Sequence, residues 1–81
     1  MADGRQWVDG VVVAWSAEEG WGRLASLHLD GEVFAHCSMI TGRDGYRELS
    51  PGEAVRFTWS SPGQDGCAHR ADEVRSVPEA R

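Results

Sequence analysis

Two short runs, residues 19–24 and 33–38, carry the side chains best suited to chemistry. In an extended strand every second side chain points to the same side. Trp21 and Arg23 therefore share one face of the first run, and Phe34 and His36 share one face of the second. If the two runs pair, rings and a guanidinium lie side by side on an open sheet. Such a surface can stack unpaired nucleic-acid bases.

The charge of the chain opposes that interpretation. Acidic residues number 13 against 8 basic residues, and the net charge is -5. All the basic residues are arginine. The acidic residues are scattered, as on a solvated surface, and their field repels a phosphate backbone. Tight, generic binding of nucleic acid is therefore disfavoured.

Size and composition predict a single domain over residues 1–81. Hydrophobic residues make up 41% of the 81 residues, which suffices for one small core. No apolar run has transmembrane length and no segment resembles a signal peptide, so we expect a cytoplasmic protein without a membrane partner. Cys37 and Cys67 could form one disulfide at most, and a cytosolic setting argues against it.

Short β-like runs alternate with breaks rich in Gly, Pro, Asp and Ser, and no segment long enough for a helix shows helical periodicity. Strands are predicted over residues 7–15, 19–27, 32–37, 53–60 and 67–77, with one helical turn at 38–41. Five short strands favour a closed barrel, which leaves no exposed edge. The pattern alone leaves an SH3-like barrel and an oligonucleotide-binding (OB) barrel open. The side chains predicted to point inward are Val12, Leu24, Val33, Ala35, Val55 and Phe57.

Several stretches resemble the bacterial cold-shock domain in their order and spacing. They are residues 10–15 (GVVVAW), 20–22 (GWG), 33–36 (VFAH) and 44–46 (DGY), followed by Leu49, Gly52, Val55 and Phe57. The resemblance runs from about residue 10 to about residue 74. It implies an all-β fold, a five-stranded antiparallel OB-fold barrel. It also implies binding of single-stranded RNA or DNA through aromatic side chains of the second and third strands.

The likeness is incomplete at the positions that would touch nucleic acid. Where the family usually has Lys-Gly-Phe-Gly-Phe, this chain has Glu-Gly-Trp-Gly-Arg at residues 19–23. Where it has Val-Phe-Val-His-Phe, Cys37 replaces the last ring. On the first strand the usual Lys-Trp-Phe aligns with Val13, Ala14 and Trp15. The nucleic-acid-binding residues that the resemblance retains, with Arg23 as a substitute, are Trp15, Trp21, Arg23, Phe34, His36 and Tyr46.

Four of these residues also have a structural alternative. Trp15 and Trp21 are either base-stacking surfaces or core residues, and the small Gly20 and Gly22 favour an outward direction for the rings. Phe34 either shares the outer face with His36 or fills the barrel. Arg23 either contacts phosphate or pairs with an acidic neighbour across the sheet.

We therefore expect a cold-shock-like protein that binds single-stranded nucleic acid weakly, through stacking, and tunes transcription or translation. The alternative is a protein-interaction or dimerisation module that uses the same exposed aromatic face. No motif of a known catalytic class is present, so no enzyme activity and no cofactor are expected. His36-Cys37 and Cys67-Ala68-His69 lack zinc-finger spacing, so no metal site is expected either.

Overall fold

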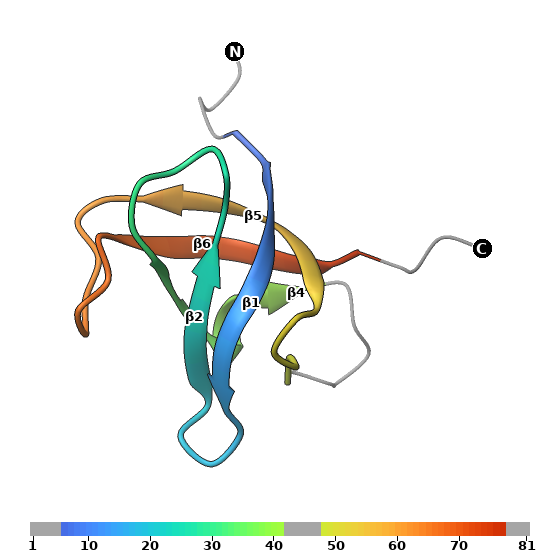
Figure 1. Cartoon of the computed structure of the whole chain (residues 1–81). Coiled ribbons are helices and arrows are strands. Elements are labelled where there is room, and N and C mark those ends of the chain that lie inside the picture. Colours follow the sequence, from blue (N-terminus) through green and yellow to red (C-terminus); the bar gives the residue numbers. More distant parts are fainter. Residues whose placement is uncertain (1–5, 42–47, 78–81) are drawn as a thin grey trace.

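The computed structural model describes residues 6–41 and 48–77 (Figure 1). Within these residues the strands are β1 (Val8–Ser16), β2 (Trp21–Ala25), β3 (Val33–His36), β4 (Ile40–Thr41), β5 (Ala54–Ser60) and β6 (His69–Ser76). One turn of 3-10 helix, Cys37–Met39, precedes β4. No helix in this part of the chain is long and apolar enough to cross a membrane.

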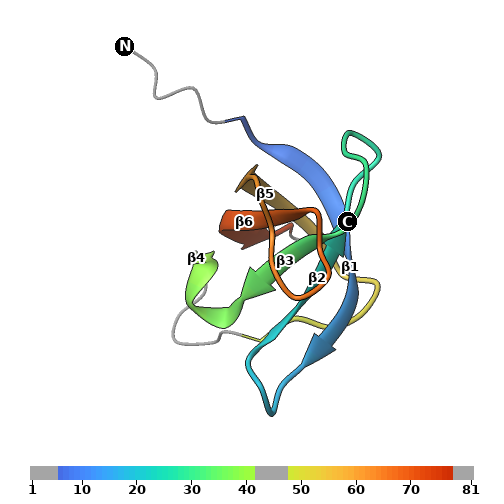
Figure 2. The ribbon, with the colours of Figure 1, turned by 90° about the vertical axis from the view of Figure 1, so that its left-hand side faces the viewer.

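The strands close into a small barrel. Neighbouring strands follow the order β3-β2-β1-β5-β6-β4, and a further pairing joins β3 to β6. Figure 2 shows the turned view, in which β6 runs beside β3 and so closes the barrel. The predicted all-β, five-stranded OB-type barrel is confirmed. Two details differ from the prediction: β3 and β6 pair in parallel, and the two-residue β4 also lies parallel to β6.

Alternation along the strands fills the barrel interior. All the side chains predicted to point inward are buried: Val12, Leu24, Val33, Ala35, Val55 and Phe57. Ile40, Leu49, Ala71 and Val74 complete the core cluster, with Trp59 packed against it. Phe57 has no exposed surface and is the largest of the fully buried side chains. A core this small depends on each of its large members.

An irregularity in β1 changes the side to which the side chains of its C-terminal half point. Val12 lies opposite Leu24, but the next paired residue, Ala14, lies opposite Arg23, so Val13 is the extra residue of a β-bulge. The side-chain alternation therefore reverses after Val12. Trp15 consequently lies opposite Gly22.

The indole of Trp15 is half-buried, packs against the core, and holds its Nε1 away from solvent without a hydrogen-bond partner. The predicted outward position of Trp15 is therefore wrong. Gly22 makes this packing possible, because a Cβ there would lie 2.5 Å from the Cε3 of Trp15. The small residue at position 22 thus leaves room for an inward ring.

Replacing Phe57 by Ala removes the largest fully buried side chain. We expect Phe57→Ala to lower the free energy of unfolding by about 3–5 kcal/mol, the usual cost of a large core truncation. The whole free energy of unfolding of such domains is about 5–15 kcal/mol, so most of the protein would unfold. Thermal denaturation followed by circular dichroism measures the loss. An unchanged melting temperature would contradict the placement of Phe57 in the core.

Candidate nucleic-acid interface

The outer side of β2 and β3 carries four side chains that the sequence predicted to lie together. Trp21 lies directly opposite His36, and Arg23 lies directly opposite Phe34. Their strand neighbours Gly22, Leu24, Val33 and Ala35 point into the barrel and are buried. The structure thus brings Trp21, Arg23, Phe34 and His36 together on one surface, here called the aromatic face.

Phe34 supports this surface without being exposed on it. Only 6% of its surface is accessible, so the prediction of an exposed Phe34 is wrong. The ring does not belong to the core cluster. It lies instead under Trp21, with ring centroids 5.2 Å apart and planes tilted by 33°. Arg23 on β2 and Arg70 on β6 stand directly opposite Phe34 on its two sides. The accessible ring of the pair is the half-buried Trp21.

A carboxylate holds the edge of the Trp21 ring. The indole Nε1–H donates to Oε1 of Glu19 over 3.0 Å. This hydrogen bond limits the rotation of the ring and so fixes the plane on which a base would stack. It also places a negative charge beside that plane, where an approaching phosphate is repelled.

His36 is held by the 3-10 turn that follows it. Its Nδ1 accepts from the backbone N–H of Ser38 over 3.2 Å, and the Ser38 hydroxyl lies 3.0 Å from the same nitrogen. An Nδ1 that accepts a backbone N–H leaves the proton of a neutral imidazole on Nε2. The second nitrogen of His36 is therefore a hydrogen-bond donor at the edge of the aromatic face.

The positive charge of Arg23 is already compensated. Its Nη1 lies 3.1 Å from Oε1 of Glu32, and both side chains are about half exposed. Of the two roles that the sequence left open for Arg23, the structure contains the ion pair with an acidic neighbour. The same holds for every arginine in the described ranges: the pairs are Arg23–Glu32, Arg56–Asp9, Arg70–Asp72 and Arg75–Glu73. No described arginine faces solvent without a nearby carboxylate.

A shallow hollow of about 250 Å³ adjoins the aromatic face. Ala14, Trp15, Trp21 and Arg23 contribute to its wall, together with Asp65 from the loop between β5 and β6. The sequence analysis missed Asp65, because a loop distant in sequence reaches this wall only once the barrel has closed. Trp15 therefore borders the candidate interface by its edge, although its ring packs inward.

Burial and nearby charges act together on the thiol of Cys67. Burial raises the pKa of the Cys67 thiol, and the carboxylates of Glu32 and Asp65 raise it further, while Arg23 acts in the opposite direction. The thiol therefore stays neutral at physiological pH.

Tyr46, the last of the predicted binding residues, lies outside the described residues.

Comparison with known proteins gives the family. The "Cold-shock" DNA-binding domain family matches residues 8–77. Cold shock protein ScoF of Streptomyces coelicolor is 42% identical over 57 residues, which cover 70% of this chain and 82% of ScoF. Cold shock-like protein CspD of Haemophilus influenzae is 38% identical over 48 residues, which cover 59% of this chain and 65% of CspD.

The match extends over nearly all of the described barrel and includes both strands of the aromatic face. The closed β-barrel, the aromatic face and the family match agree. The chain belongs to the cold-shock DNA-binding domain family and is a nucleic-acid-binding, cold-shock-like protein.

Proposed function

We propose that the chain binds single-stranded RNA or DNA weakly, by stacking an unpaired base on Trp21. The observation that carries the proposal is the half-buried Trp21 indole, which packs on Phe34 and is fixed at its edge by Glu19. His36 offers a hydrogen-bond donor beside the stacked base, and Arg23 offers a guanidinium. Base–aromatic stacking contributes about 1–3 kcal/mol per base and tolerates any sequence.

Weak binding follows from the charges around the ring. Glu19, Glu32 and Asp65 lie at or beside the aromatic face, and Arg23 is paired with one of them. A phosphate that approaches Arg23 meets the carboxylate of Glu32, which already contacts Nη1 of this arginine. Stacking therefore supplies most of the free energy of binding, and phosphate contacts supply little.

A protein of this kind would hold strands unpaired and so tune transcription or translation. Unpaired bases are the feature that the proposed surface recognises, and RNA and single-stranded DNA both present them. The alternative, a protein-interaction surface on the same face, is not favoured. It requires a broad exposed apolar patch, and in that patch Phe34 is buried and Trp15 packs its ring against the core.

The first test removes the stacking ring. We expect Trp21→Ala to weaken binding of a pyrimidine-rich single-stranded oligonucleotide by about 1–3 kcal/mol, measured by fluorescence anisotropy. The barrel should stay folded, because Trp21 lies outside the core cluster. Leu27→Ala is the matched control, since Leu27 is fully exposed away from the aromatic face. Equal affinity of Trp21→Ala and wild type would contradict the stacking proposal.

The second test reverses the charge beside the ring. We expect Glu19→Lys to raise oligonucleotide affinity about fivefold at low salt, with a smaller gain as salt increases. Glu18→Lys, an equal charge change at an exposed neighbour, should give a smaller gain. Glu19→Gln keeps an oxygen that can accept from the Trp21 indole and separates the charge effect from the orientation of the ring. If neither wild type nor Glu19→Lys binds at high protein concentration and low salt, the proposal fails.

The third test counts phosphate contacts through the salt dependence of binding. Each contact to a single strand contributes a slope of about -0.7 to log affinity against log salt. We expect a slope that corresponds to about one to three phosphate contacts, because the arginine of the aromatic face is already paired. A slope steeper than about -4 would show that basic residues dominate binding and that stacking is secondary.

A further inference from the structure

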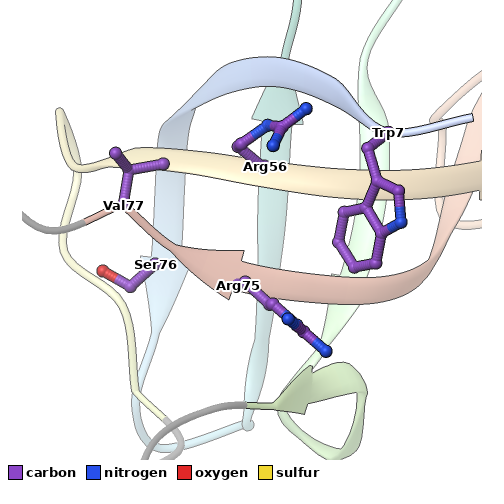
Figure 3. Close-up of a pocket in the computed structure, with 5 residues that line it drawn as sticks. All are labelled: Trp7, Arg56, Arg75, Ser76 and Val77. Atoms are coloured by element: carbon purple, nitrogen blue, oxygen red, sulfur yellow. The ribbon is translucent and has the colours of Figure 1, made fainter.

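A second hollow lies on the barrel wall formed by β5 and β6, and it shares no lining residue with the hollow beside the aromatic face. Its volume is about 370 Å³, and Trp7, Arg56, Arg75, Ser76 and Val77 line it. Figure 3 shows these side chains in front of β5 and β6, while β2 and β3 pass behind them. Trp7 stands one residue before the family match. The family assignment therefore carries no expectation for Trp7.

The indole of Trp7 lies over the outer side of β5, pointing toward β6 (Figure 3). Val8 pairs with Phe57, so Trp7 is level with Thr58. Thr58 is fully buried although its strand neighbours Arg56 and Ala54 are exposed. The guanidinium of Arg75 lies 5.2 Å from the centre of the Trp7 ring. A half-buried ring is thus fixed beside a cation.

The two arginines face each other across neighbouring strands. Arg56 on β5 and Arg75 on β6 are direct partners in the antiparallel ladder. Like charges in this relation repel, and a bound anion relieves the repulsion. Each side chain turns away from the other toward its own carboxylate, Arg56 toward Asp9 and Arg75 toward Glu73. The hollow opens between the diverging side chains (Figure 3).

Both guanidiniums retain donors for an anion. Arg56 approaches Oδ1 of Asp9 through Nε, at 3.1 Å. Arg75 approaches Oε2 of Glu73 through Nε and Nη2, each at 3.3 Å. These contacts leave Nη1 and Nη2 of Arg56 and Nη1 of Arg75 as the guanidinium nitrogens that can turn to an anion. Among the described residues that line the hollow, the charged ones are Arg56 and Arg75.

We propose that this hollow binds one nucleotide of a single-stranded nucleic acid, with its phosphate between Arg56 and Arg75 and its base against Trp7. A volume of about 370 Å³ falls in the range of small-molecule sites and exceeds the need of a lone phosphate. Guanidinium donors match phosphate oxygens, and an indole matches a base. The identification of the occupant as a nucleic acid rests on the proposed function. The site itself is separate from the aromatic face, so a bound strand contacts two walls of the barrel.

The indole N–H signals of the four tryptophans in a ¹H–¹⁵N spectrum report the two sites separately, once Trp→Phe variants have assigned them. We expect hexathymidylate to shift the signals of both Trp7 and Trp21. Thymidine 5′-monophosphate should shift Trp7, and thymidine, which lacks the phosphate, should do so with about tenfold lower affinity. A shift at Trp21 alone refutes the second site and leaves the proposed function standing. A shift at Trp7 alone refutes the proposed function and leaves the second site standing. No shift at either tryptophan refutes both.

Variants test the role of the arginines. The double variant Arg56→Gln, Arg75→Gln should weaken the Trp7 response to thymidine 5′-monophosphate about tenfold and leave the Trp21 response to hexathymidylate within twofold. Both side chains are more than half exposed, so the melting temperature should hold. Asp9→Asn removes the carboxylate that competes for Arg56 and should strengthen the response. An unchanged Trp7 response in the double variant overturns the proposal. So does a pentaglutamate peptide that shifts Trp7 as strongly as the nucleotide, because it identifies an acidic peptide as the occupant.

Discussion

The packing of Trp15 over Gly22 is the contact on which the aromatic face depends. The bulge at Val13 turns the indole inward, and the absence of a side chain at Gly22 gives the ring its space. With Trp15 directed inward, the outer side of this part of β1 carries Ala14, directly opposite Arg23, beside the exposed Val13 of the bulge. The hollow beside Trp21 exists because the residue at that position is small. One local departure from regular strand geometry therefore decides which indole can meet a ligand.

Sequence patterns predicted the fold well where strands are regular and poorly where they are not. Val33, Ala35, Val55 and Phe57 were assigned correctly, because alternation within one strand determines their direction. The direction of Trp15 depends on a bulge that appears only when β1 pairs with β2.

The sequence predicted which residues form the candidate site. It did not predict how exposed they are or which charges surround them. The four residues of the aromatic face lie together as pairing of two predicted strands requires. Phe34 is buried where the parallel pairing of β3 with β6 sets Arg70 opposite it. Asp65 lines the hollow from a loop that is distant in sequence. Both follow from closure of the barrel, which alternation along single strands does not describe.

The ion pairs give this acidic barrel a mode of anion exchange. At each described arginine a carboxylate is tethered by the fold and so present at high local concentration. An anion that leaves such an arginine leaves behind a guanidinium that still has its tethered carboxylate. A carboxylate at this distance lowers the affinity of the arginine for a second anion. The barrel is thereby suited to brief contacts that are made and broken many times along one strand.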